Sequence, residues 1–426
     1  MRRGVVGILL VTLAAAPAAA QQVEVTLQEA VRRALDVQPA MVQARGDERT
    51  AGAGRRSAFG AFLPTVTTSG SASRSNQPIR IQGDTTTFPP GYTYSGGLNL
   101  SLDLFAGFRR LWDLKSSYAS VDAAGASVVN QRYQVTLQTK QVFFNALATD
   151  ELVRVAQSQV TRAEQQLRIS IDKLHAGSAT RSDPLRSTVD YGNARIALLQ
   201  AEANLATAQA NLGRQIGIDQ RVRAVPDSSL PPLPDTAALR SSLPQTPQVE
   251  AADAQARAAR AQVWSARSQY WPRLNVSYAN TRSGISDPAL PFLNGYPERF
   301  SWSFGLSWTL FNGFAREQNQ VSASVARDNA EARAADTRRF VTAQLTQQLA
   351  ALSTAFEQIS IARDNLAAAT EDLRVQNERY RVGAATILDL LTSQAALTQA
   401  EVNVVQTRFN YLIARAQVEA VLGRTL

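Results

Sequence analysis

The sequence contains no cysteine and only one histidine, His175. The lack of cysteine excludes disulfides, thiolate metal sites, a cysteine nucleophile and a lipid attached to an N-terminal cysteine. A single histidine leaves no His/Cys metal cluster, so we expect neither a metal site nor a cofactor. The sequence also has no GxSxG, GxGxxG or P-loop motif. The composition therefore predicts a protein that is not an enzyme, with His175 as an ordinary surface residue.

Long apolar runs are missing beyond the first 20 residues. Arg2 and Arg3 precede an apolar segment at residues 5–16, and three alanines at 18–20 offer a cleavage site. Residues 1–20 are therefore predicted to be a secretory signal peptide. The apolar segment is too short to span a membrane as a helix, and no later window approaches ~20 apolar residues. Any insertion into a membrane would have to use β-strands.

Charge is unbalanced, with 44 Lys and Arg against 35 Asp and Glu, which gives a formal net charge of +9. A basic chain suggests nucleic acid or an anionic surface as a partner. The arginines are spread along predicted helices instead of being clustered with aromatic residues. We interpret most of them as solvated or snorkelling side chains, and we expect no nucleic-acid partner.

Residues 299–314, RFSWSFGLSWTLFNGF, alternate strictly between large apolar and small or polar side chains. Period-two alternation predicts a β-strand with one apolar face, and about 9–11 tilted residues are enough to cross a bilayer. A half-buried strand of a soluble sandwich is the plainer alternative. Because the apolar side chains are so large, we predict a lipid-facing strand. Its apolar face comprises Phe300, Trp302, Phe304, Leu306, Trp308 and Leu310.

A near-copy of this strand lies at residues 92–108, YTYSGGLNLSLDLFAGF. The two copies end in LFAGF and LFNGF, and a glycine at Gly107 and Gly313 suits a sharp bend from strand to helix. Weaker strands begin after Pro64 and Pro272, each separated from its stronger partner by a polar loop. We therefore predict β-hairpins at 64–105 and 272–311.

Very long helices are predicted after each strong strand. Residues 109–176 and 315–382 contain no proline, and at ~1.5 Å per residue each helix would approach ~100 Å. Return helices are predicted at 182–216 and 387–422, each ended by a glycine. Residues seven apart indicate coiled-coil packing. They include Val153, Val160, Leu167 and Leu174 in the first half and Leu345, Leu352, Ile359, Leu366, Leu373 and Tyr380 in the second.

The two halves align at a nearly constant spacing. Pro272 follows Pro64 by 208 residues, and Phe314 follows Phe108 by 206. Agreement over more than a hundred residues indicates an internal duplication. We divide the mature chain into repeat 1 at 21–225, a proline-rich linker at 226–235 and repeat 2 at 236–426. Each repeat contains a helix, a β-hairpin and a long helical hairpin, at 109–217 and 314–422.

Four strands per chain are too few to close a barrel, because the smallest membrane barrels use about eight. Open strand edges are not tolerated in lipid, so several copies would have to share one barrel. Two copies would fill the barrel with side chains, whereas three would leave a passage. We predict a mixed, mainly α fold. A transmembrane β-barrel shared between protomers continues into a long antiparallel α-helical barrel.

The chain resembles the outer-membrane efflux protein family typified by TolC over essentially its whole mature length. The resemblance is carried by LFAGF and LFNGF, by the tip motifs HAGSATRSDPL and RVGAATILDLL, and by RFNYLIARAQVEAVLG. It implies a homotrimer in the Gram-negative outer membrane, with a helical tunnel that extends into the periplasm. Such a duct passively conducts drugs or secreted proteins. It works with a periplasmic adaptor and an inner-membrane transporter.

The resemblance also assigns roles at the helix tips. Acidic residues matching Asp183 and Asp389 narrow the pore and bind cations in the family, and a tyrosine matching Tyr380 helps to hold the tips shut. Ala385 and Thr392 replace a basic and an acidic residue of the prototype. The gate would therefore be held differently, through Arg181 or Arg381. The tips would also face the adaptor, and the adaptor-facing residues would be Gly177, Gly383, Thr180 and Thr386.

Two alternatives stay open on the sequence alone. The carboxylates of Asp183 and Asp389 have an ordinary explanation as helix caps, which is compatible with a gate. A periplasmic coiled-coil scaffold without a channel, whose strands pair in a soluble sheet, is an alternative from another class. Washing membranes without detergent separates these readings, because a scaffold would come off and a barrel would stay.

Overall fold

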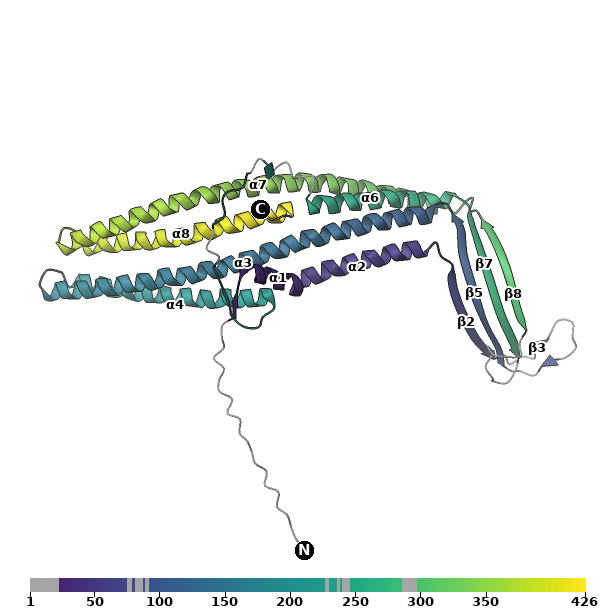
Figure 1. The fold of residues 1–426 in the computed structure, drawn as a ribbon, viewed down its shortest axis with the longest axis horizontal. Coiled ribbons are helices and arrows are strands. Elements are labelled where there is room, and N and C mark those ends of the chain that lie inside the picture. Colours follow the sequence, from purple (N-terminus) through teal and green to yellow (C-terminus); the bar gives the residue numbers. More distant parts are fainter. Residues whose placement is uncertain are drawn as a thin grey trace, which may run out of the picture.

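The computed structural model describes residues 23–426, except 75–78, 81–86, 89–91, 227–229, 236–237, 240–245 and 286–296. The predicted signal peptide lies outside the described residues. The molecule is elongated, with a β-sheet at one end and the tips of two helical hairpins at the other (Figure 1). None of the described helices has an apolar stretch long enough to cross a membrane.

Four antiparallel strands form the sheet in the order β2 (Thr65–Arg74), β5 (Tyr92–Ala106), β7 (Arg273–Ile285) and β8 (Glu298–Ser307). Each predicted hairpin supplies one adjacent pair, and the pairing of β5 with β7 joins the two halves of the chain. A short ribbon of β3 (Ile79–Arg80) and β4 (Thr87–Phe88) accompanies the sheet. Among the described residues, no strand pairs with the outer edge of β2 or β8.

Two details of the strands correct the prediction. The strand predicted to continue to residue 311 ends at Ser307, whose partner Arg273 is the first residue of β7. Trp308 therefore lies beyond the strand, and its indole nitrogen donates to the Tyr270 carbonyl at 3.1 Å. In β5, the pairing shifts between Asp103 and Phe105. This β-bulge interrupts the alternation at the intervening residue.

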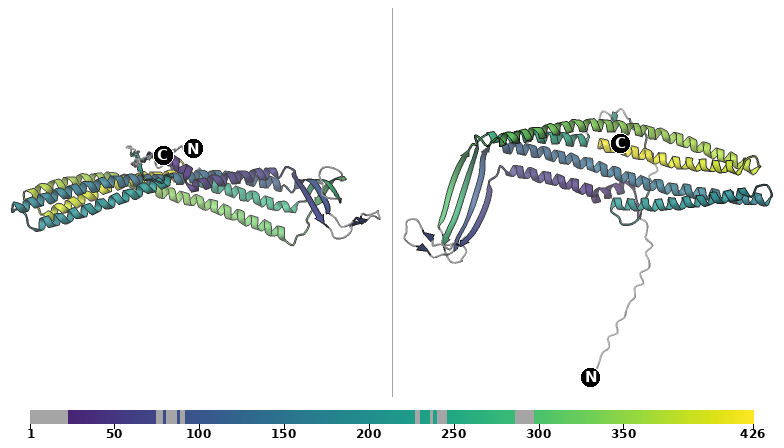
Figure 2. Two further views of the ribbon diagram at one scale, coloured as in Figure 1. Left: turned by 90° about the horizontal axis from the view of Figure 1, so that it is seen from below. Right: turned by 180° about the vertical axis from the view of Figure 1, so that it is seen from behind.

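Two antiparallel hairpins make up the long body. The first comprises α3 (Arg109–His175) and α4 (Ser182–Ile216), and the second α7 (Ala315–Arg381) and α8 (Ile387–Leu422). Figures 1 and 2 show both hairpin tips at the end opposite the sheet. The predicted seven-residue seam of α7 is confirmed by its burial. Its buried members include Leu345, Leu352, Ile359, Leu373 and Tyr380.

Shorter helices complete the body between its middle and the sheet. After α1 (Leu27–Val37), α2 (Pro39–Gly60) runs beside α3, and α6 (Pro247–Arg267) lies in the second half (Figure 1). The sequence also predicts a helix at 236–269. The part of it that α6 covers begins at Pro247, where proline suits the first helical turn, and residues 236–237 and 240–245 lie outside the described residues. One 3₁₀ turn, η2 (Ser268–Tyr270), leads into β7.

A small parallel pair near the middle was not predicted. β1 (Val23–Val25) pairs with β6 (Val222–Ala224), next to the linker. Three-residue strands are too short to give a periodic signal. Around them lies a core that includes Phe143, Phe144, Leu212, Ile216 and Phe409.

Candidate functional site

One face of the sheet carries large apolar side chains in rows. The register places Leu100, Tyr278 and Trp302 side by side in one row, and Leu102, Val276 and Phe304 in the next. Tyr278 and Trp302 bring their ring centres to 4.9 Å. Cross-strand aromatic pairs of this kind stabilise a sheet without any cover from a helix.

These apolar side chains are open to the surroundings. Between 63% and 73% of the surface of each of Phe300, Trp302, Phe304 and Leu306 is exposed. Trp308, which lies after the strand, is 60% exposed. A contiguous exposed apolar band marks a contact with lipid or with another protein.

The two strand-to-helix turns have the same geometry. Gly107 and Phe108 have φ of 61° and 65°, and Gly313 and Phe314 have φ of 65° and 66°. A positive φ costs little at glycine but is strained at phenylalanine. Each turn therefore holds one residue in a conformation that its surroundings must maintain.

An arginine two residues after each phenylalanine holds the turn, a role that the sequence did not suggest. Nη2 of Arg110 donates to the Leu104 carbonyl at 3.0 Å, and Nη2 of Arg316 donates to the Leu310 carbonyl at 2.8 Å. The Arg110 guanidinium also lies over the Phe62 ring, at 5.1 Å from its centre. The detectable signal was the arginine repeated at the same place after LFAGF and LFNGF.

The first hairpin tip is closed by local contacts of the predicted residues. Gly177 has φ of 72°, which ends α3, and the Thr180 hydroxyl donates to the Asp183 carboxylate at 2.6 Å. The amide of Asp183 donates to the Thr180 carbonyl at 3.1 Å. His175 is exposed beside this turn.

The second tip contains a complete capping box between Thr386 and Asp389. The Asp389 amide donates to the Thr386 hydroxyl at 3.3 Å, and the Asp389 carboxylate accepts from the Thr386 amide at 2.9 Å. The Thr386 hydroxyl also donates to the Asp389 carboxylate, at 2.8 Å. The two bonds that this carboxylate accepts, from the Thr386 amide first and then from its hydroxyl, lower the pKa of Asp389 below its usual value. The Thr392 hydroxyl donates to the carbonyl of Leu388 in its own helix, and Gly383 has φ of 80°.

Tyr380 connects the two tips. It is buried, with 5% of its surface exposed, and burial followed by the charge of Asp183 raises its pKa. Lys173 of α3 donates to the Tyr380 carbonyl and places its ammonium 4.3 Å from the ring centre. The Tyr380 hydroxyl is buried and has no hydrogen-bond partner among the described residues.

The structure therefore places the charge of Asp183 near enough to Tyr380 to act on its pKa. Asp389 is bonded to the start of its own helix, and the charge of Arg379 on α7 also acts on its pKa. Neither arginine suggested for the gate reaches these carboxylates. Arg381 pairs with Glu378 at 2.9 Å, and Arg181 makes no ion pair in the described part of the chain. Lys173 provides the cationic contact, which sequence reasoning missed because the contact joins helices from different halves.

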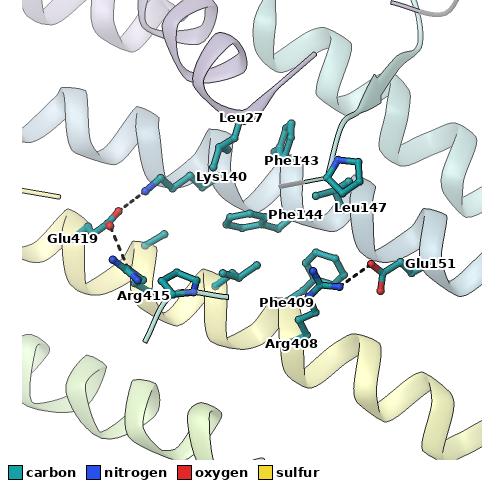
Figure 3. Close-up of a pocket in the computed structure, with 14 residues that line it drawn as sticks. Leu27, Lys140, Phe143, Phe144, Leu147, Glu151, Arg408, Phe409, Arg415 and Glu419 are labelled. Atoms are coloured by element: carbon teal, nitrogen blue, oxygen red, sulfur yellow. Dashed lines mark hydrogen bonds and ion pairs between the residues drawn. The ribbon is translucent and has the colours of Figure 1, made fainter. Parts of the chain in front are cut away.

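A series of ion pairs ties α3 to α8 between the middle of the molecule and the tips. On α3 its members are eleven residues apart, and they are Lys140 with Glu419, Glu151 with Arg408 at 3.2 Å, and Arg162 with Glu401 at 2.8 Å. We call this series the α3–α8 ladder. Figure 3 shows its first two pairs at the rim of an aromatic-lined pocket. The ladder fixes the first hairpin against the second.

A known protein family and a known relative match this chain over most of its length. The family model described as outer membrane efflux protein matches residues 30–217 and 238–424. The outer membrane efflux protein BepC of Brucella suis biovar 1 (strain 1330) is 22% identical over 392 residues, covering 85% of this chain and 78% of BepC.

Solved structures show the same fold. The Campylobacter jejuni CmeC outer membrane channel superposes with a TM-score of 0.80 at 18% identity, over 93% of this chain and 85% of CmeC. The outer membrane protein VceC of Vibrio cholerae superposes with a TM-score of 0.80 at 17% identity, over 94% of this chain and 96% of VceC.

These findings confirm the predicted family, the outer-membrane location with a body extending into the periplasm, and the role of an exit duct. The relatives are named as channels and efflux proteins and not as enzymes. With the family model matched over most of its length, the chain belongs to the outer membrane efflux protein family.

Proposed function

We propose that three copies of this chain form one continuous duct. Each copy contributes four strands to a twelve-stranded barrel, and the helical hairpins form a tube beneath it. The support is the sheet itself, whose four strands are too few to close and whose outer edges have no partner among the described residues. Lipid does not tolerate such edges, so other copies must cover them.

The proposal includes an origin by internal duplication. α3 and α7 have the same length of 67 residues, and both begin after a glycine and a phenylalanine with positive φ. The family model also matches the chain in two successive segments of similar length. A repeated unit of hairpin strands and hairpin helices accounts for all three observations.

Substrates would move passively through the water-filled interior, and the helix tips would form the gate. Asp183 and Asp389 would lie near the threefold axis, where carboxylates attract cations, and Tyr380 with Lys173 would hold the tips together. Thr392 would take no direct part, since its hydroxyl is bonded within its helix. The exposed residues of the tips would meet a periplasmic adaptor that links the duct to an inner-membrane transporter. These are Gly177, Thr180, Gly383 and Thr386.

A single observation carries the proposal, the exposed apolar band of Phe300, Trp302, Phe304 and Leu306 at the end of helices 67 residues long. The test uses the full chain purified from outer membranes. Native mass spectrometry should give three subunits, and planar bilayers should show discrete conductance steps. Deleting the gene should raise sensitivity to dyes, antibiotics or metals, or block secretion of a protein.

The result that would overturn the duct is a single subunit that washes from membranes without detergent. That outcome would favour the coiled-coil scaffold, in which the band of apolar side chains would have to be covered by another protein.

A further inference from the structure

A pocket of about 210 Å³ lies near the middle of the molecule, between α3, α8 and the linker (Figure 3). Leu27 at the start of α1 and the linker residues Pro226 and Pro231 complete its lining. An apolar cavity of about 150 Å³ is large enough to bind benzene. The pocket can therefore hold one aromatic ring with a short polar substituent.

Aromatic side chains form the apolar part of the pocket. Phe143 and Phe144 come from α3 and Phe409 from α8. The ring centre of Phe144 lies 6.1 Å from that of Phe143 and 6.4 Å from that of Phe409. Aromatic rings prefer edge-on or offset contacts with centres about 4.5–7 Å apart. A further ring in the pocket would therefore find the kind of contact that these three rings already make with one another.

Charged side chains surround the aromatic part. Three are basic and two are acidic, and they are Lys140, Arg408 and Arg415 with Glu151 and Glu419. Both oxygens of Glu419 are engaged, one by the ammonium of Lys140 and the other by the amide of Leu426 at 3.2 Å. Glu151 accepts from Arg408 at 3.2 Å (Figure 3). Since the carboxylates have partners and basic side chains are in excess, the lining favours an anion over a cation.

Arg415 carries an unused donor in the wall of this pocket. Its side chain is only 16% exposed, with Nη2 donating to the main-chain oxygen of Leu426 and Nε 3.8 Å from Glu419. The guanidinium also interacts with Tyr411, whose hydroxyl donates to the Pro231 carbonyl at 2.9 Å. Nη1 is nevertheless buried without a hydrogen-bond partner among the described residues.

This unused donor limits the kind of ligand. A buried N–H group without a partner costs free energy, and a guanidinium binds a carboxylate more tightly than a neutral oxygen. A neutral aromatic molecule would fill the apolar part but would bring no charge to Nη1. An aromatic amine would add a cation beside three basic side chains. An aromatic acid suits both parts of the pocket.

We propose that the pocket binds a small aromatic carboxylate, with its ring against Phe144 and Phe409 and its carboxylate at Nη1 of Arg415. The volume admits a ligand with a single ring. All of the lining residues belong to one chain, so the ligand would bind whether or not copies assemble into a duct. Neither the helix tips nor the exposed apolar band of the sheet takes part.

A bound ligand would bridge the two halves of the chain. Phe144 belongs to α3 of the first half and Arg415 to α8 of the second, and two pairs of the α3–α8 ladder border the same pocket. A molecule that binds the folded chain and not the unfolded chain stabilises it by mass action. The aromatic acid should therefore raise the unfolding temperature of the chain, and the rise should grow with ligand concentration.

The test measures binding of para-fluorobenzoate to the full chain in detergent by fluorine NMR. We expect saturable binding with a Kd of about 1 mM or tighter, a modest efficiency for a ligand of this size. Two probes of similar size, para-fluorobenzyl alcohol and para-fluorobenzylamine, should bind about tenfold more weakly or not at all. Uptake into detergent micelles does not saturate and is subtracted. No saturable binding of the acid, or equal binding of the three probes, would overturn the proposal.

A substitution at Arg415 tests which side chain holds the carboxylate. Arg415→Met removes Nη1 and keeps an apolar stem, so the acid should bind about tenfold more weakly. Arg154→Met is the matched control and should leave the affinity unchanged, because Arg154 is 64% exposed on α3 and pairs with Asp150 outside the pocket. Equal affinity of the Arg415 variant and the parent would overturn the assignment.

Ala416→Leu provides a second measurement in case Arg415→Met folds poorly. Ala416 is buried in the lining, and a larger side chain there takes up the space of the ligand while every charge stays in place. Saturable binding of para-fluorobenzoate and the rise in unfolding temperature should both disappear. Saturable binding that survives in this variant would place the site elsewhere and overturn the proposal.

Discussion

The ammonium of Lys173 lies over the ring of Tyr380, 4.3 Å from its centre, and donates to the carbonyl of the same tyrosine. Lys173 is in the last turn of α3 and Tyr380 in the last turn of α7, so one side chain joins the tips of both hairpins. A cation over an aromatic ring contributes about 0.5–2 kcal/mol.

We predict that Lys173→Met loosens the tips, because it removes the charge and the hydrogen bond but keeps much of the apolar stem. Single-channel conductance should rise, or large antibiotics should enter cells severalfold faster. Lys115→Met is the matched control, since Lys115 lies over Trp112 of its own helix at 5.1 Å. Equal conductance of the Lys173 variant and the parent would contradict a role in closing the tips.

The capping box at the second tip leads to a prediction about pH. The carboxylate of Asp389 is stabilised by its bonds, so its pKa is lowered. The stabilisation is therefore complete above the ordinary aspartate pKa of about 3.9 and is lost as pH falls through the lowered value. Amide exchange at residues 386–390 should accelerate only in that acidic range.

Thr386→Ala removes the hydroxyl bond and keeps the backbone amide bond, so it should raise the pKa of Asp389 part of the way towards its ordinary value. Loss of the cap should cost the start of α8 about 0.5–2 kcal/mol. Carboxyl NMR of labelled aspartate and amide exchange at neutral pH would measure both effects. Thr392→Ala is the control, because its hydroxyl bonds only to Leu388 in its own helix. A pKa of Asp389 that stays unchanged in the Thr386 variant would show that the Thr386 hydroxyl does not contribute to the lowered value.

Substituting alanine for each of the two strand-to-helix glycines should distinguish the cost of backbone strain from the cost of overlap with neighbouring atoms. Both glycines have positive φ, so alanine costs about 1 kcal/mol at either position. At Gly107 it also overlaps the Ser268 carbonyl. Gly107→Ala should therefore reduce the yield of folded chain strongly.

Gly313→Ala should fold as a chain with only the local cost, yet lower the dissociation temperature of the proposed trimer if a second copy packs closely against that turn. The comparison needs two measurements, the folded yield and the thermal dissociation of the trimer. A trimer of the Gly313 variant that matches the parent would argue against close approach of the second copy at that turn.

The α3–α8 ladder allows a double-mutant cycle at Arg162 and Glu401. Their side chains are only 21% and 22% exposed and lie 2.8 Å apart, so each single removal leaves a partly buried charge alone. We expect a coupling of about 1–3 kcal/mol between Arg162→Met and Glu401→Gln in urea unfolding. The exposed pair of Arg374 and Glu371 on α7 should give almost none, and equal coupling at both sites would contradict a structural role for the ladder.

Much of the long body could be predicted from local signals. Helices without proline, ended by glycine at Gly217 and Gly423, follow from backbone chemistry alone, and both glycines have positive φ. The ordinary explanation of Asp389 as a helix cap could be predicted because a capping residue in the first helical turn is a local pattern, and the structure shows it as a capping box with Thr386. The turn glycines were likewise visible in the repeated LF-x-GF motif.

Contacts between distant segments were not predictable in the same way. Lys173 meets Tyr380 across 207 residues, and nothing near Lys173 marks it as different from other helical lysines. The end of β8 depends on where β7 begins, which is a matter of pairing and not of the local alternation of side chains. The eleven-residue spacing of the ladder was present in the sequence, but its partners on α8 become meaningful only once the two helices are adjacent.

That spacing has a consequence for the shape of α3. The helix buries Ala156, Ala163 and Ser170, which are seven residues apart, and the last of these bonds to Ser187 of α4. Towards α8 it presents charges eleven residues apart. Seven residues in two turns favour a left-handed superhelix, and eleven in three turns favour a right-handed one. The seven-residue and eleven-residue spacings therefore favour opposite superhelix senses on the same helix. Supercoiling in either sense therefore cannot build up along α3, so neighbouring helices can pack side by side as a flat wall instead of winding around one another.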